Sequence, residues 1–156
     1  MELSYKRGSL FYEREVIPMR LWHKNLIPVL PDKQLLAQWR ECCCIARNIQ
    51  VNGTPNHLLV NPVMDYPLDH LWSYGNRIYV EMTFRGFSAD LSKLAKYFPS
   101  EAQKLSPMSR IWPSWHTNRY LLQCYYNLQE KYDRGGISKA EWEKVRDYVE
   151  ISKKLL

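Results

Sequence analysis

The chain has 156 residues, of which 46% are hydrophobic and 24% are charged, and this is the size and composition of one globular domain. Wholesale disorder is excluded, because disordered chains are much poorer in apolar residues. No apolar run approaches the roughly 18 residues that span a bilayer, and residues 1–18 contain three acids and three bases with no signal-peptide pattern. The sequence therefore predicts a cytoplasmic protein that neither crosses a membrane nor is secreted.

Basic residues exceed acidic ones by 22 to 16, which gives a net charge of +6. The excess lies in two stretches: residues 19–50 contain five bases and two acids, and residues 101–156 contain ten and seven. Residues 1–18 and 51–100 are balanced. An uneven positive charge favours a polyanionic partner such as nucleic acid, although many basic proteins bind none.

The four cysteines do not form a disulfide framework, because three of them (Cys42, Cys43 and Cys44) are consecutive. Neighbouring residues on a helix point about 100° apart, so one metal ion cannot bind all three thiols. The histidines show no metal-binding spacing either. We expect no metal site and no cofactor, and we interpret the thiols as small buried hydrophobic groups.

Residues 1–18 show no helical or strand period and are predicted to be an appended arm, so that the domain comprises residues 19–156. Two prolines predict an extended path over residues 27–31. A helix then begins at Asp32, the candidate N-cap, and ends at Asn52–Gly53. Its apolar positions recur at spacings of three and four: Leu35, Leu36, Trp39, Cys42, Cys43 and Ala46.

A second helix is predicted over residues 68–85 with Gly86 just after its end, and a short third helix within 88–97. Gly75 either weakens the second helix or permits close approach of a neighbour. Thr117 is predicted to cap a helix that ends at residues 135–136, and Ser138 with Glu141 forms a capping box for the last helix. The fold class is therefore all-α: a compact single-domain bundle of three to four main helices with irregular loops.

The segment Met19-Arg20-Leu21-Trp22-His23, followed by residues 34–42 (QLLAQWREC), carries a resemblance to a known family. It is similar to the endonuclease V-type pyrimidine dimer DNA glycosylases, which are also abasic-site lyases, and to their bacterial relatives. The resemblance continues at residues 81–87 (EMTFRGF) and 112–116 (WPSWH). It thus covers most of the chain from residue 19 to about 137, and the order and spacing of the blocks carry it.

This resemblance implies a metal-independent DNA repair glycosylase with abasic-site lyase activity. Such enzymes use their N-terminal α-amino group as the nucleophile, which would be that of Met19 if the functional chain begins there. The carboxylate at the reaction centre would be Glu41. The resemblance implies DNA contacts by basic residues, which would be Arg20, Arg40, Arg47 and Arg119. The expected partner is double-stranded DNA containing damaged bases or abasic sites, bound by a monomer.

The chemistry suits these roles. An α-amine has an ordinary pKa of about 7.7–8.0, so roughly a tenth of it is a neutral nucleophile at pH 7, whereas a lysine is almost wholly protonated. A carboxylate beside the sugar stabilises developing positive charge and moves protons. Arg40, next to Glu41, is expected to contact phosphate and to keep the carboxylate ionised.

The sequence departs from the family at Gln34, where the family has His, and at Cys44, where it has a second Arg that Arg47 could replace. Three alternatives remain open: a start at Met19, processing of a longer chain, and a module of the same fold that binds DNA without cutting it. A protein-interaction domain is a further possibility.

Two groups of residues also allow two readings. His23 suits either sugar positioning or a structural role. The cluster around Trp112, Trp115 and His116, with Arg110 and Arg119, suits either a DNA wedge or packing under a loop. The remaining large apolar residues at helical spacing are predicted to be core: Trp39, Trp72, Tyr79, Leu121 and Tyr125.

Overall fold

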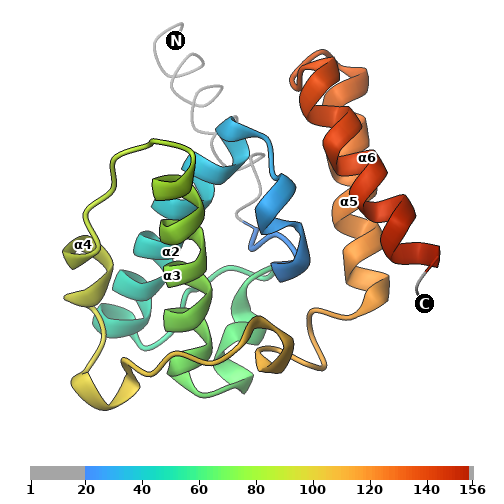
Figure 1. Ribbon diagram of the computed structural model, residues 1–156. Helices are drawn as coiled ribbons and strands as arrows, with labels where there is room; N and C mark the ends of the chain where they lie inside the picture. The colour runs from blue at the N-terminus through green and yellow to red at the C-terminus, as the bar shows by residue number, and fades with distance from the viewer. Residues whose placement is uncertain (1–19, 155–156) are drawn as a thin grey trace, which may run out of the picture.

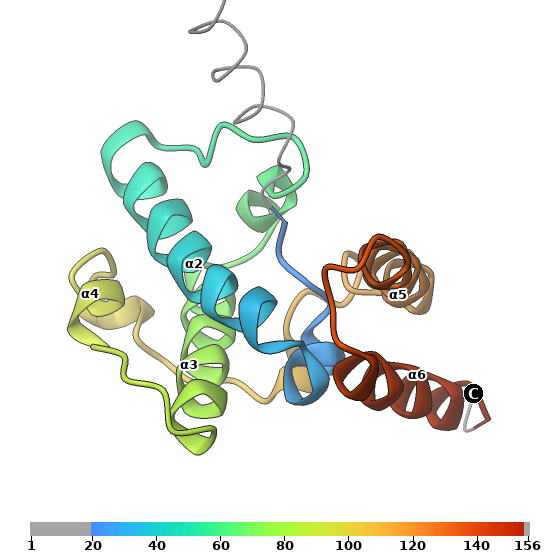
Figure 2. The ribbon, with the colours of Figure 1, turned by 90° about the horizontal axis from the view of Figure 1, so that it is seen from above.

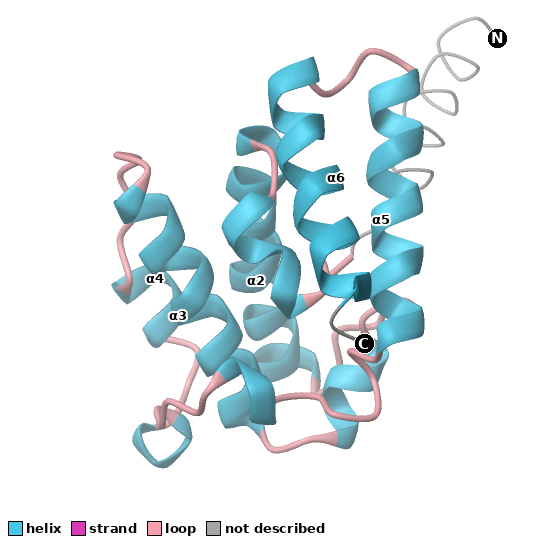
Figure 3. Cartoon of the chain, turned by 45° about the vertical axis from the view of Figure 1, so that its right-hand side comes forward, coloured by secondary structure: helices cyan, strands magenta, loops and turns pink. Residues whose placement is uncertain are grey.

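The computed structural model describes residues 20–154, which form helices joined by irregular loops and contain no strand (Figure 3). The α-helices are α2 (Asp32–Asn52), α3 (Leu68–Phe84), α4 (Ser92–Ala95), α5 (Asn118–Asp133) and α6 (Lys139–Lys154). The 3-10 helices are η1 (Lys24–Val29), η2 (Asn61–Asp65), η3 (Ser100–Ala102) and η4 (Met108–Arg110). The all-α prediction with four long helices is confirmed. The predicted arm, residues 1–18, and Met19 lie outside the described residues.

Two helix pairs make up the fold. Helix α2 packs against α3, with α4 against α2, and α5 and α6 form an antiparallel hairpin on the other side (Figures 1 and 2). Between the pairs lies the segment from Arg20 to η1, which contacts both α3 and α6. The start of the described chain is therefore surrounded by helices from both halves. None of the helices in residues 20–154 is both long and apolar enough to cross a membrane.

The helix ends follow the sequence signals closely. Helix α2 stops at Gly53, whose φ of 76° is left-handed, and the turn after α3 contains Gly86 with φ 87°. The Thr117 side chain accepts a hydrogen bond from the N–H of Tyr120 at the start of α5. At the start of α6 the capping box is present, because the Ser138 hydroxyl accepts from the N–H of Glu141 at 3.2 Å.

Two local predictions are wrong. The segment over residues 27–31 is not extended throughout, because residues 24–29 form η1 with Pro28 inside it. The fixed φ of proline is compatible with a 3-10 turn, and only Leu30 and Pro31 are extended. Asp32 is not the N-cap but the first residue of α2. Its N–H donates to the Glu141 carboxylate of α6 at 2.8 Å, which caps the helix from a distant part of the chain.

The residues predicted as core are buried, except that Tyr79 is only partly buried. The prediction of buried thiols holds for Cys42 and Cys124 but is wrong for Cys44, which is exposed, and Cys43 is only partly buried. Gly75 makes a close approach possible: a Cβ there would lie 2.6 Å from Cδ2 of Leu94, the buried residue of α4. Arg85, at the end of α3, donates to the Leu30 carbonyl at 2.6 Å and to Asp32 at 3.0 Å. It therefore ties α3 to the junction between η1 and α2.

Candidate active site

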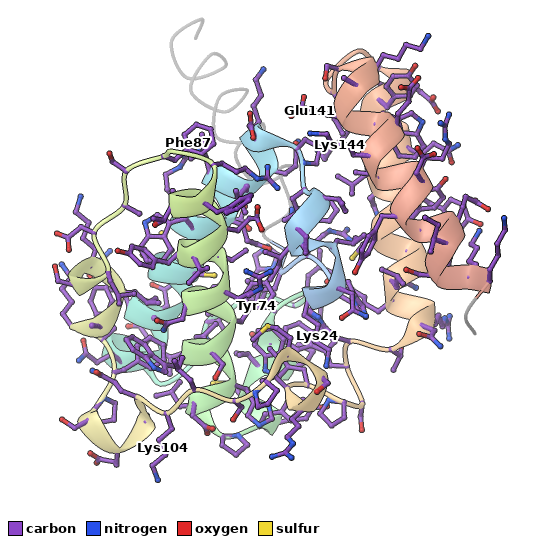
Figure 4. All side chains as sticks on the ribbon, viewed as in Figure 1. Lys24, Tyr74, Phe87, Lys104, Glu141 and Lys144 are labelled. Atoms are coloured by element: carbon purple, nitrogen blue, oxygen red, sulfur yellow. The ribbon has the colours of Figure 1, made fainter. Side chains whose placement is uncertain are left out.

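Side chains from three helices fix the backbone of residues 20–22. Gln38 of α2 accepts from the Trp22 N–H at 2.6 Å and donates to the Arg20 carbonyl at 2.7 Å. The Tyr74 hydroxyl of α3 lies 2.6 Å from the Trp22 carbonyl, and the Tyr120 hydroxyl of α5 donates to the Leu21 carbonyl at 2.7 Å. Figure 4 shows Tyr74 between α3 and this segment. Such a buried network, with its hydrogen bonds satisfied, holds the backbone of residues 20–22 in a single conformation.

Glu41 lies against the first described residue of this segment. Its Oε2 accepts from the Arg20 N–H at 3.3 Å and from the Gln38 side-chain amide at 2.9 Å. Gln38 and Glu41 are three residues apart on α2, so they share one face of the helix. One glutamine thus holds both the chain segment and the carboxylate beside it.

The pKa of Glu41 is raised from its ordinary value, because burial removes water from the carboxylate. The hydrogen bonds from Arg20 and Gln38 and the charges of Arg40 and Arg20 act in the opposite direction, but burial outweighs them. Arg40 was expected to keep the carboxylate ionised. Its charge does lower the pKa of Glu41, but burial raises that pKa by more. A carboxyl group with a raised pKa is suited to accepting and returning a proton.

A cavity of about 170 Å³ opens beside Glu41, between α2 and α5. Its cations are Arg20, Lys33 and Lys131, and Asn127 lines it from α5. A second cavity of about 390 Å³ shares Arg20 and Asn127 and continues along α5, past Tyr120, Gln123 and Tyr126, to Leu59. The carboxylate therefore lies in a pocket with a basic rim that continues into a second hollow.

The structure separates the two neighbouring residues of the predicted Arg–Glu pair. Arg40 and Arg47 are exposed and line a different and larger groove of about 800 Å³, between α2, α3 and α4. Residues 40, 44 and 47 fall on one helix face because four and seven residues nearly complete whole turns, whereas residue 41 is rotated by about 100° from residue 40. Of the predicted DNA contacts, only Arg20 lines the Glu41 cavity.

The remaining predicted residues are spread around this site. Arg119 is exposed on the first turn of α5 and lines neither cavity near Glu41. His23 is 1% exposed, accepts from the Asn25 N–H at 3.1 Å, and has its other ring nitrogen 3.0 Å from the His116 carbonyl. Trp112 is fully buried, so it packs under the loop. His23 and Trp112 thus have structural surroundings.

Sequence reasoning missed several residues that shape the site: Gln38, Tyr74, Tyr120, Asn127, Lys33 and Lys131. The spacing of Gln38 and Glu41 on one helix was a usable signal for Gln38. For Tyr74, Tyr120 and Lys131 there was none, because their approach depends on how α3 and α5 pack. Within residues 20–154, no three His, Cys, Asp or Glu side chains are grouped to hold a metal ion.

The fold and the site define a small all-α protein with a carboxylate in a cavity rimmed by cations. Residues 19–95 match a protein-family model described as pyrimidine dimer DNA glycosylase. This segment is therefore similar to the pyrimidine dimer DNA glycosylases, a family of DNA repair enzymes, and the resemblance found in the sequence is confirmed. No curated protein and no solved structure matches the chain. Helix α5, which closes the Glu41 cavity, lies outside the matched segment.

Proposed function

We propose that the protein is a DNA repair glycosylase with abasic-site lyase activity, acting on pyrimidine dimers or related base lesions. The observation that carries the proposal is the 3.3 Å hydrogen bond from the Arg20 backbone nitrogen to the Glu41 carboxylate. Successive Cα atoms are about 3.8 Å apart. In a chain that begins at residue 19, the free amine therefore belongs to the residue directly before the one whose N–H binds this carboxylate. The family match begins at the same residue.

The chemical step uses that amine as a neutral nucleophile. Its nitrogen attacks C1′ of the damaged nucleotide while the bond from C1′ to the base breaks, and the base leaves with a proton. Opening of the sugar gives an imine to the enzyme. Loss of a proton from C2′ then eliminates the 3′ phosphate and cuts the strand, and water releases the sugar from the amine. Glu41 is the group that stabilises positive charge at C1′ and carries the protons.

The charges around the pocket support a DNA substrate. Arg20, Lys33 and Lys131 line the Glu41 cavity from the N-terminal segment, α2 and α5. Three cations that line one cavity with a carboxylate suit the phosphates on either side of an extruded nucleotide, since phosphate contacts fix the position of a DNA strand without reading its sequence. Arg40, Arg47 and Arg119 remain proposed phosphate contacts farther from the reacting carbon.

The test is borohydride trapping on DNA with one abasic site, using the full chain and a chain that begins at Met19. Borohydride reduces the imine to a stable covalent adduct, so the chain with the free amine at position 19 is expected to be trapped. In that chain Glu41→Gln keeps a similar shape but loses the charge and the proton carrier, so strand cleavage should fall about 10²- to 10⁴-fold.

Each alternative gives a different result. Salt-sensitive DNA binding with no adduct from either chain would reject the amine mechanism and favour a binding module of the same fold. An adduct that persists together with unchanged cleavage in Glu41→Gln would remove this carboxylate from the reaction. An adduct with the full chain alone would move the nucleophile away from residue 19.

A further inference from the structure

The groove lined by Arg40 and Arg47 lies on the side of α2 that faces away from Glu41. It is formed by α2, the end of α3 and the segment over residues 88–97, and its volume is about 800 Å³. Its floor is apolar and includes Leu36, Cys43, Met82 and Tyr97. Burial raises the pKa of Cys43 to about 11, so this thiol stays protonated at neutral pH and adds to the apolar floor.

Four cations line this groove: Arg40 and Arg47 from α2, and Lys93 and Lys96 from α4 and its C-cap. All four are exposed, and none forms an ion pair with a carboxylate within residues 20–154. Asp90 is the one acid among the lining residues, and it already accepts hydrogen bonds from the Ser92 N–H and hydroxyl. Like charges that line one groove repel each other, and a polyanion bound there would relieve that repulsion.

An apolar floor between basic walls also indicates the form of the polyanion. A duplex presents its phosphates and keeps its bases stacked inside, so it leaves such a floor in contact with water. An unpaired strand presents phosphates together with sugars and base faces, which pack on aromatic and apolar side chains. Tyr97 offers such a ring in this groove, where the Lys96 ammonium now lies 5.1 Å from its centre.

We infer that this groove binds unpaired DNA, with the four cations on its phosphates and the apolar floor under its sugars and bases. The site is separate from the Glu41 cavity, and it requires neither a damaged base nor a free amine at residue 19. Its occupancy can therefore be tested on undamaged DNA with the full chain.

Cys44 provides a reporter inside the groove. It is exposed and lines the groove, whereas Cys42 and Cys124 are buried and the pKa of Cys43 is raised. Alkylation by N-ethylmaleimide, followed by mass spectrometry, should therefore modify Cys44 first at neutral pH. A saturating 15-nucleotide oligo-dT is expected to slow that modification several-fold, and a duplex of the same length, which would meet only the phosphate contacts of Arg40 and Arg47, should slow it less.

Charge removal tests the same site by affinity. Lys93→Gln with Lys96→Gln should weaken oligo-dT binding roughly tenfold at low salt and reduce the slope of log K against log salt by about 1.4. Lys139→Gln with Lys144→Gln is the matched control, because both lysines are exposed on α6, on the opposite side of the molecule from α4 (Figures 1 and 4). This control should retain the affinity and the slope.

Two results would overturn the inference. One is a Cys44 alkylation rate that oligo-dT leaves unchanged or that a duplex slows equally. The other is a Lys93/Lys96 variant that binds oligo-dT like its α6 control. Failure of borohydride trapping leaves both measurements intact, so loss of the proposed enzyme activity and loss of this site are told apart.

Discussion

The two sides of α2 solve opposite electrostatic problems. On one side Gln38 and Glu41 lie among buried groups, and the carboxylate pKa is raised by loss of water. On the other side Arg40 and Arg47 are exposed beside a wide groove. One helix therefore presents a desolvated acid in one direction and solvated bases in the other, although Arg40 and Glu41 are neighbours in sequence.

The difference teaches where geometry is held tightly and where it is not. The Glu41 side contains hydrogen bonds that fix individual atoms, such as those of Gln38 to Arg20 and Trp22. The groove side contains charges that act over several ångströms and need no exact position. Reaction chemistry requires the first kind of surface, and binding of the phosphate backbone of DNA requires the second.

The largest expected effect on stability comes from breaking the fixed side. Gln38→Ala leaves the buried Trp22 N–H without its partner and removes a partner from the Arg20 carbonyl and from Tyr74. Each orphaned buried group costs about 1–3 kcal/mol, so we expect a loss of about 3 kcal/mol in the free energy of unfolding. Urea denaturation measures it.

Gln50→Ala is the matched control on the same helix. Gln50 is exposed and makes one long hydrogen bond, 3.4 Å to the Lys96 carbonyl, so its loss should be within about 0.5 kcal/mol. Equal losses in the two variants would mean that the network around residues 20–22 contributes nothing special. A loss confined to Gln38→Ala would sharpen the contrast between the two sides.

A smaller effect per residue is expected from pH, because two histidines are buried here: His23, which directly follows residues 20–22, and His116 beside it. Burial lowers the pKa of His23 to about 4, with Lys24 adding to the effect, and burial lowers the pKa of His116 well below its ordinary range. A base with a depressed folded pKa contributes stability that is complete above its unfolded value of about 6.5 and is lost as pH falls. None of the residues lining the groove on the other side is a histidine.

Between pH 6.5 and 5 these histidines bind protons in the unfolded chain but stay mostly neutral in the folded chain. The slope is up to about 1.4 kcal/mol per pH unit for each histidine, so His23 alone should cost about 1–2 kcal/mol over this interval. Urea denaturation at several pH values measures it. His23→Asn should flatten the slope. A free energy of unfolding that stays constant from pH 6.5 to 5 would contradict the neutral buried histidines.

The sequence predicted those features that depend on residues close together along the chain. Thr117, Ser138 with Glu141, and Gly86 each act within a few residues of their own helix end, so their signals are local. The fold class followed from the helical spacing of apolar residues. The resemblance at residues 19–42, confirmed by the family match, pointed to Glu41.

The features that were missed or predicted wrongly depend on distant parts of the chain. The N-cap of α2 was assigned to Asp32, but the cap comes from Glu141, 109 positions away. Tyr120 reaches the Leu21 carbonyl across 99 positions. No local pattern can specify such pairs, since they are set by the packing of α5 and α6 against the N-terminal segment. The same holds for Lys131, which lines the Glu41 cavity only because α5 lies beside α2.

The smallest expected effect tests the groove side, where Leu94 of α4 lies against Gly75 of α3. In Gly75→Ala the new methyl group would lie 2.6 Å from Cδ2 of the fully buried Leu94, so Leu94 and its helix α4 must shift. Overpacking of this kind destabilises by about 1–3 kcal/mol, whereas the higher helix propensity of alanine relative to glycine stabilises by up to about 1 kcal/mol. We therefore expect a net loss of about 1 kcal/mol in the free energy of unfolding.

A double-mutant cycle separates these two terms by their sign. The three nearest atoms to the new methyl group all belong to the Leu94 side chain, and Leu94→Ala removes them. In that background the 2.6 Å contact is gone, so the gain in helix propensity should dominate and Gly75→Ala should stabilise by up to about 1 kcal/mol. A Gly75→Ala effect of the same sign in both backgrounds would show that contact with Leu94 is not what requires glycine at this position. A reversal of sign would identify Leu94 as the contact that holds α4, and with it Lys93 and Lys96, against α3.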